Sequence, residues 1–145
     1  MKLKNIDHLV ITTSNLEACL HFYVDVLGMN HRVVDGQHIL EFGREKINIH
    51  TYVGEFTPLA KHAAVGCSDF CLIAEGDIHE IKRNLECAGV EIIEGVCEQA
   101  GALGLMDSVY MYDPDGSLVE VAVYRKEQML TNQHLLTYNT HRIKL

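Results

Sequence analysis

Residues 113–121 read DPDGSLVEV, a short turn followed at once by a β-forming segment. Proline at the second place of Asp113–Gly116 and glycine at the fourth fit a type I turn. The apolar and β-branched residues on either side predict two strands around this turn, at 108–112 and 118–124. This stretch therefore marks the chain as β-rich near its end, and the rest of the fold can be traced back from it.

The residues before this turn predict a helix between two strands. The helix is expected to begin at Asp77, with Glu80 three residues on in capping-box spacing, and to end at Gly89. The other elements expected here are a strand at 68–74 (SDFCLIA), a strand at 90–96 and a glycine-containing loop at 100–104 (AGALG). From residue 68 onward the order is therefore β-α-β-β-β.

The first half of the chain predicts the same order. A helix is expected from Ser14, with Glu17 in capping-box spacing, to Gly28, which suits a left-handed C-terminal position. The Asp35-Gly36 pair is a good hairpin signal. The strands expected around these features are 5–13 (NIDHLVITT), 31–34, 38–42 and 46–53 (KINIHTYV). An internal repeat outweighs any single motif, so we predict a duplicated βαβββ module.

This duplication predicts an α+β fold in which two modules pair into a curved mixed sheet around a central cleft. The expected organisation is one domain over residues 1–124, with modules at about 4–53 and 67–124, and a C-terminal tail over 125–145. The tail is polar with scattered leucines, and either a short packed helix or partial disorder is compatible with it.

Composition narrows the classes of function. Twelve Lys and Arg against 20 Asp and Glu give a formal net charge of −8, which argues against nucleic acid as a partner. No apolar run is long enough to span a bilayer or to form a signal-peptide core, so we expect a cytoplasmic protein with no membrane partner. The five cysteines include no CxxC pair and are expected to be reduced thiols.

Four polar residues stand on otherwise apolar predicted strands and occupy matching places in the two modules. His8 and Asp69 lie near the two module starts, and His50 and Glu120 lie near the two module ends. A carboxylate among valines and leucines is costly to bury without a partner, and a divalent cation is one such partner. Imidazole and carboxylate donors together suit Fe, Mn, Co, Ni or Zn.

The segments IDHLVIT, KINIH, GCSDFCLI and DPDGSLVEV resemble the glyoxalase, bleomycin-resistance and extradiol-dioxygenase (vicinal oxygen chelate) superfamily. The closest resemblance is to glyoxalase-domain-containing-5-like proteins, and it covers residues 4–124. It implies metal ligands at His8, His50 and Glu120. Asp69 stands where many members have a second histidine, which makes a dioxygenase less expected than a lyase or isomerase.

The resemblance implies a glyoxalase-type lyase or isomerase acting on a small substrate with two neighbouring oxygens. The divalent metal would act as a Lewis acid that stabilises an enediolate. Glu120 or Asp69 would be the catalytic base that moves a proton between adjacent carbons. Ser108, Tyr110 and Arg44 are further candidates for substrate contact.

Other functions remain open at this point. An extradiol-type dioxygenase, a metal-free small-molecule binding or resistance protein, and a resistance transferase acting on a thiol substrate all share the fold. Ligand-type side chains at the predicted ligand positions favour the enzyme over the metal-free binding protein. A homodimer is expected from the resemblance.

Overall fold

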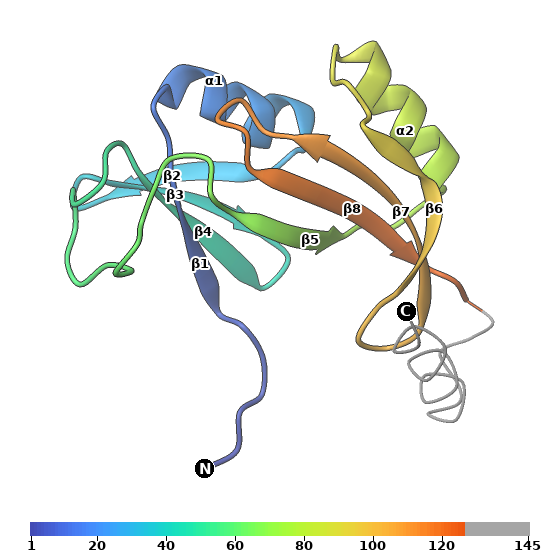
Figure 1. Cartoon of the computed structure of the whole chain (residues 1–145), viewed down its shortest axis with the longest axis horizontal. Coiled ribbons are helices and arrows are strands. Elements are labelled where there is room, and N and C mark those ends of the chain that lie inside the picture. The colour runs from blue at the N-terminus through green and yellow to red at the C-terminus, as the bar shows by residue number, and fades with distance from the viewer. Residues whose placement is uncertain (127–145) are drawn as a thin grey trace. The chain divides into compact units, whose positions relative to one another are not determined.

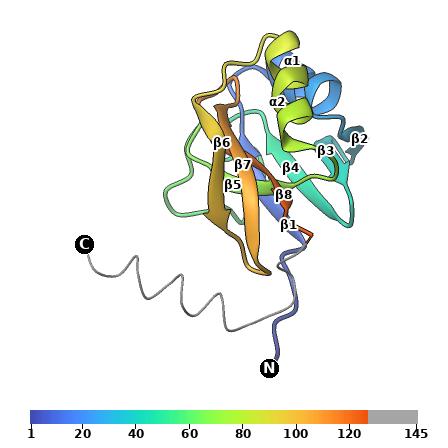
Figure 2. The same ribbon diagram turned by 90° about the vertical axis from the view of Figure 1, so that its right-hand side faces the viewer.

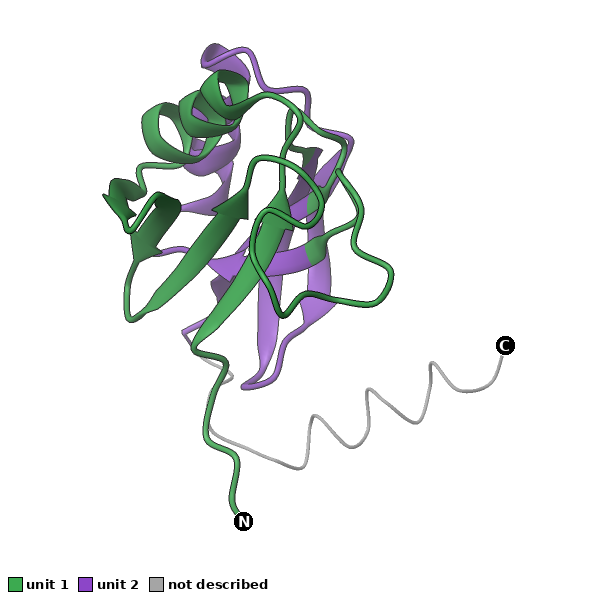
Figure 3. Ribbon diagram, turned by 90° about the vertical axis from the view of Figure 1, so that its left-hand side faces the viewer, with its two compact units in different colours: residues 1–69, 112–118 green, residues 70–111, 119–145 purple. Residues whose placement is uncertain are grey.

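A computed structural model describes residues 1–126 and confirms the doubled β-α-β-β-β order and the α+β class (Figure 1). All but two residues of the predicted tail, 125–145, lie outside the described part. The chain divides into two compact units, coloured in Figure 3. Unit 1 holds residues 1–69 and 112–118, and unit 2 holds residues 70–111 and the chain from Val119.

The sheet of unit 1 has four strands in the order β1-β4-β3-β2, with β1 parallel to β4 and the other pairs antiparallel. The strands are β1 (His8–Thr12), β2 (Asn30–Val34), β3 (Gln37–Phe42) and β4 (Glu45–His50). The predicted turn between β2 and β3 is confirmed. Asp35 and Gly36 have φ angles of 49° and 81°, as a two-residue type I′ hairpin requires.

The helix of unit 1 begins one residue later than predicted. α1 (Leu16–Leu20) is capped by Asn15, whose side chain accepts a hydrogen bond from the Ala18 amide, and not by Ser14. Ser14 is unavailable as a cap because its amide and hydroxyl both donate to Asp115. The helix then widens into a π-helical segment (His21–Val26), where the Leu27 amide bonds to the Phe22 carbonyl.

One face of the unit 1 sheet forms the core of that unit. Side chains alternate across a strand, so Ile11 on β1 and Ile47 and Ile49 on β4 share a face, and all three are buried. The core is completed by residues of the helical segment and its flanks: Cys19, Phe22, Tyr23 and Met29. The opposite face carries His8, Thr12 and His50.

The second sheet has the equivalent order β5-β8-β7-β6, which Figure 1 shows, and Figure 2 views it from the side of β6. Its elements are β5 (Asp69–Ile73), α2 (Ile78–Cys87), β6 (Glu94–Ala100), β7 (Leu105–Tyr112) and β8 (Leu118–Tyr124). Asp77 caps α2 as predicted, accepting hydrogen bonds from the amides of His79 and Glu80. The apolar side of α2 buries Ile78 and Leu85.

Three strands of the second module differ in their bounds from the prediction: β5 is one residue shorter at each end, and β6 and β7 differ by three or four residues. β6 begins at Glu94 instead of Val90, because the Val90 amide still bonds to the Leu85 carbonyl at the end of α2. β7 begins at Leu105, three residues before the predicted strand. β8 has the predicted bounds, so the hairpin around residues 113–116 is confirmed.

Candidate functional site

The β1–β4 pair fixes where the two candidate histidines lie. His8 faces Lys46, Val10 faces Asn48 and Thr12 faces His50. These residues have the same parity along the strands, so their side chains share the sheet face opposite the core of unit 1. The register places His8 and His50 at opposite ends of the pair, four residues or about 13 Å apart along the strands. It does not bring the two imidazoles side by side.

His8 has one ring nitrogen engaged. Its side chain is 44% exposed, and Nδ1 lies 2.7 Å from Oδ1 of Asp7. With the Nδ1 proton donated to this carboxylate, the lone pair of Nε2 is left for another partner. Metal-binding histidines commonly show this carboxylate contact at the second nitrogen.

His50 lies in a different environment. It is only 5% exposed, and its ring packs against Phe56 with the ring centroids 5.3 Å apart. With Thr12 and Val10, it lines a pocket of about 490 Å³ in unit 1. The remaining lining residues come from the segment between β4 and β5: Pro58, Leu59, Ala60, Ala63, Ala64, Cys67 and Ser68.

The β5–β8 pair repeats the register of β1 and β4. In the first pair, the Lys46 amide bonds to the Asp7 carbonyl and the Thr13 amide bonds to the His50 carbonyl. The second pair has the equivalent two bonds: the Leu118 amide bonds to the Ser68 carbonyl, and the Ala74 amide bonds to the Ala122 carbonyl. Asp69 therefore faces Leu118, Cys71 faces Glu120, and Ile73 faces Ala122.

This register corrects one predicted match. Asp69 is the counterpart of His8, as predicted, but the counterpart of Glu120 is Asn48 and the counterpart of His50 is Ala122. The prediction placed His50 two residues too early in the repeat, because only donor residue types were compared. Asn48 was not predicted as a site residue for the same reason.

Asn48 and Glu120 share an unusual property. Asn48 is 8% exposed, and its side-chain oxygen Oδ1 is buried with no hydrogen-bond partner. Oε1 of Glu120 is likewise buried and without a partner. Leaving a polar atom buried and unpaired costs about 1–3 kcal/mol. The alternation in K-I-N-I-H, with Asn48 between two isoleucines, was the signal that could have revealed this position.

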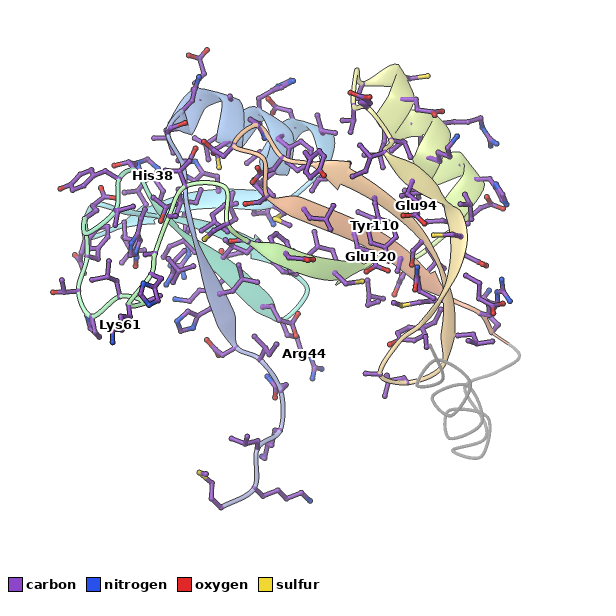
Figure 4. The ribbon with its side chains drawn as sticks, viewed as in Figure 1. His38, Arg44, Lys61, Glu94, Tyr110 and Glu120 are labelled. Atoms are coloured by element: carbon purple, nitrogen blue, oxygen red, sulfur yellow. The ribbon has the colours of Figure 1, made fainter. Side chains whose placement is uncertain are left out.

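Glu120 lies between two protic side chains on neighbouring strands, and Figure 4 shows Tyr110 beside it. Partial burial raises the pKa of the Cys71 thiol to about 12, helped by the charge of Glu120 and a hydrogen bond to it. Burial, the charge of Glu120 and hydrogen bonding to it also raise the pKa of the Tyr110 phenol. Both groups therefore stay protonated at neutral pH and can donate hydrogen bonds to an oxygen.

The other predicted residues are placed as follows. Asp69 is exposed at the start of β5. Ser108 is fully buried on β7, and its hydroxyl has no hydrogen-bond partner. Arg44 lies at a polar pocket of about 540 Å³ in unit 1 (Figure 4). Three cations (Arg32, Arg44, Lys46) and three carboxylates (Asp7, Glu41, Glu45) line that pocket, so its charges balance.

Comparison with known proteins decides the family. The family model of the Glyoxalase/Bleomycin resistance protein/Dioxygenase superfamily matches residues 5–121. The chain belongs to this superfamily. Its members include lyases, fosfomycin-resistance enzymes and dioxygenases, so membership alone leaves the reaction open.

Individual members of the superfamily give the same result. Virulence protein STM3117 of Salmonella typhimurium is 38% identical over 125 residues, covering 86% of this chain and 87% of that protein. An integron cassette protein from the mobile metagenome of V. cholerae is 40% identical, with a TM-score of 0.82 over 86% of this chain and 98% of that one. Lactoylglutathione lyase from Agrobacterium tumefaciens is 25% identical, with a TM-score of 0.65 over 84% and 95%.

A divalent metal is common in this superfamily. Within residues 1–126, no three His, Cys, Asp or Glu side chains are grouped closely enough to hold an ion. The single donors nonetheless suit one: His8 has Nε2 free beside its Asp7 contact, and Glu120 has an unpartnered carboxylate oxygen.

The helices of residues 1–126 lack the length and apolar character needed to span a membrane.

Proposed function

We propose that this superfamily member is a divalent-metal-dependent lyase or isomerase of glyoxalase type, acting on a small substrate with two neighbouring oxygens. The observation that carries this proposal is the buried Oε1 of Glu120, which has no hydrogen-bond partner among residues 1–126. A buried carboxylate oxygen without a partner costs free energy unless a cation binds it or a substrate donates a hydrogen bond to it.

The proposed ligands are His8 and Glu120, with Asp69 as a third ligand or as the base. Asp69 is favoured because it occupies the register position of His8 in the second strand pair. His50 was predicted as a ligand from the sequence. We now propose that it contacts substrate instead, since it lies four register positions away from His8 and lines a pocket.

The chemistry divides between the ion and the protein. When bound, the ion would supply Lewis acidity toward the two substrate oxygens. Glu120 or Asp69 would accept a proton from the carbon beside the substrate carbonyl and return it to the neighbouring carbon. Tyr110 and Cys71, both protonated, would donate hydrogen bonds to Glu120 and hold its carboxylate in place.

Metal analysis of purified protein tests the proposal. Wild-type protein, reconstituted in turn with Zn, Ni, Fe, Mn and Co and then desalted, is expected to retain about one ion per site. His8→Ala and Glu120→Gln should retain less than about a tenth of that amount. His62→Ala is the matched control, because His62 is exposed in the loop after β4. Wild-type protein that stays metal-free after every reconstitution would refute the proposal.

An activity screen then selects the reaction. Hemithioacetals test the lyase, catechols with Fe(II) test the alternative extradiol-type dioxygenase, and epoxide antibiotics with a thiol test the transferase. The Agrobacterium relative named as a lactoylglutathione lyase supports starting with hemithioacetals. Turnover should follow the metal content across the variants. An activity that persists in Glu120→Gln would show that Glu120 is neither a ligand nor the base of that reaction.

A metal-free binding or resistance protein is the second candidate. The observation in its favour is the apolar pocket beside His50, which resembles a sequestration site more than a site for a polar metabolite. This candidate predicts ligand binding by protein that holds no metal and shows no turnover. Both candidates include a cytoplasmic homodimer. Light scattering of the full chain can test whether the protein is a dimer.

A further inference from the structure

The pocket beside His50 has a lining that defines the chemistry of its occupant. We propose that it binds a neutral, mainly apolar group of the ligand, with the His50 imidazole as the polar contact. The inference rests on the proposed function only in taking a small molecule as the ligand, and it holds with or without a metal. It names a substrate class, where the proposed function requires only two neighbouring oxygens.

The walls of the pocket are apolar and open to an incoming molecule. Val10 and Leu59 line it, yet they are 45% and 41% exposed. Pro58, Ala60 and Ala63 add further apolar surface from the segment between β4 and β5. Apolar surface kept exposed around a concave site is costly in a free protein, and it favours ligands that cover it.

Two of the polar side chains of the pocket, Thr12 and His50, lie together, and the segment before β5 adds Cys67 and Ser68. Thr12 and His50 face each other across β1 and β4, so their Cα atoms are about 4.8 Å apart. Both are at least 90% buried, and the Phe56 ring packs against the imidazole. An imidazole in this position can donate or accept one hydrogen bond to a ligand hydroxyl or carbonyl.

The second module offers nothing equivalent. The register position of His50 is taken there by Ala122, and that of Thr12 by Ile73. The pair is therefore specific to the first module and is not required by the repeated backbone. A buried polar pair found in only one of two equivalent strand pairs is better explained by ligand binding than by a requirement of the fold.

Charge narrows the ligand further. In the described part of the chain, no lysine or arginine lines this pocket. Lys61 belongs to the same loop, but it is exposed and is not among the lining residues (Figure 4). An anionic group would lose its hydration here without gaining a cationic partner. A ligand with carboxylates, such as a glutathione adduct, would therefore have to place them elsewhere.

A pair of matched probes tests the inference on the full chain. 2-Naphthol and 2-naphthoate have the same aromatic body, and only the second is anionic at neutral pH. The chain contains no tryptophan, so naphthyl fluorescence can be followed without that background. We expect 2-naphthol to bind at least about tenfold more tightly than 2-naphthoate, because only the carboxylate loses solvation without compensation.

Two variants locate the binding. Ala63→Phe fills the pocket and should weaken 2-naphthol binding at least about tenfold, whereas Ala102→Phe, in an exposed loop that does not line the pocket, should leave it unchanged. His50→Leu keeps the bulk and removes the polar contact, so about a five- to tenfold loss is expected. Thermal unfolding of each variant checks that it is folded.

The outcomes separate this inference from the proposed function. Equal binding of the two probes, or full binding by folded Ala63→Phe, would overturn the inference whatever the metal content. Binding of 2-naphthol that is unchanged by EDTA supports it even if the metal proposal fails. Metal content is measured on the same samples, and a His50→Leu protein that loses its metal along with its 2-naphthol binding would return His50 to the ligand set and overturn its role here.

Discussion

The strand pairs β1–β4 and β5–β8 share one backbone register and place different side chains in it. Asp69 takes the position of His8, Glu120 that of Asn48, and Ala122 that of His50. The middle position holds a buried, unpartnered side-chain oxygen in both pairs. It is an amide in the first and a carboxylate in the second, so the repeat preserves an acceptor while changing its charge.

The β2–β3 turn of the first module and the β7–β8 turn of the second module differ as well. The Asp35-Gly36 turn is exposed. In the turn at 113–116, Asp113 is 6% exposed and accepts a hydrogen bond of 2.8 Å from the Tyr23 hydroxyl. Asp115 accepts from Thr13 and Ser14 at the start of α1. The second turn therefore supports the structure of unit 1, and a tight turn is all the first one supplies.

Adding a methyl group near each turn should give the largest difference. A Cβ on Gly66 would lie 2.1 Å from the Asp115 carbonyl oxygen, at a φ of +68°, so Gly66→Ala should destabilise the protein by about 3–5 kcal/mol. Gly36 also has a positive φ but open space around it, so Gly36→Ala should cost only about 1 kcal/mol. Urea unfolding followed by circular dichroism measures both, and equal costs would contradict the contrast.

Apolar replacement of the two unpartnered oxygens should come next in size. In metal-free protein, Asn48→Leu is expected to raise the free energy of unfolding by about 1 kcal/mol, since it removes an unsatisfied polar atom. Glu120→Met should change it by less than about 1 kcal/mol, because it removes an unsatisfied oxygen and also the acceptor of Cys71 and Tyr110. An added divalent ion should stabilise the wild type and not Glu120→Met. A metal-free Asn48→Leu protein that is less stable than the wild type would show that the Asn48 amide has a structural partner.

The sequence predicted the repeat because its signals are local. The Asp77 cap, the Asp35-Gly36 hairpin and the strand at 118–124 each depend on neighbouring residues only, and each is confirmed. Ser14 was wrong as a cap because Asp115, about a hundred residues away, takes its hydrogen bonds. Tertiary contacts of that range leave no local signal.

The candidate site was predicted less well, for a related reason. His8 and Asp69 fall at corresponding register positions, but Glu120 corresponds to Asn48 and His50 corresponds to Ala122. Register depends on which backbone groups pair, and a shift of two residues preserves the sheet face, so alternation alone could not detect the error. Asn48 was missed because an amide is not a typical metal ligand.

Acid should affect the second turn more than the first. Burial acts to raise the pKa of Asp115, but hydrogen bonds from Thr13 and Ser14 outweigh it and lower the pKa below the ordinary value. A lowered carboxyl pKa contributes stability above pH 4 or so, and that stability is lost as pH falls through the folded-state pKa. Asp115→Asn should flatten the decline of unfolding free energy below about pH 4, by about 1 kcal/mol or less because Asp115 is partly exposed.

Asp35→Asn is the matched control for this titration. It makes the same change in the exposed turn of the first module, where asparagine also tolerates a positive φ. Its pH dependence of stability should follow that of the wild type. If the two variants flatten the curve equally, the hydrogen bonds to Asp115 are not the source of the effect.

The smallest expected difference concerns the residues that follow β4 and β8. Arg125, after β8, donates from Nε and Nη2 to the two oxygens of Asp107 on β7, at 3.0 and 2.6 Å, and from Nη1 to Glu98 on β6. Thr51, after β4, has local contacts in the described part of the chain. Its hydroxyl donates a hydrogen bond of 3.0 Å to Oε1 of Glu55, and its amide donates to Oε2 of the same residue. A lysine cannot reproduce the paired bonds of a guanidinium, so Arg125→Lys should cost about 0.5–1 kcal/mol at these half-exposed positions.

Raising the salt to about 1 M should shrink the cost of Arg125→Lys, because mobile ions screen the charges that Arg125 brings together. Thr51→Val removes a neutral donor, so its cost should change less with salt. A cost for Arg125→Lys that is independent of salt would mean that packing of the arginine stem, and not its charge, holds the end of β8 to its neighbours.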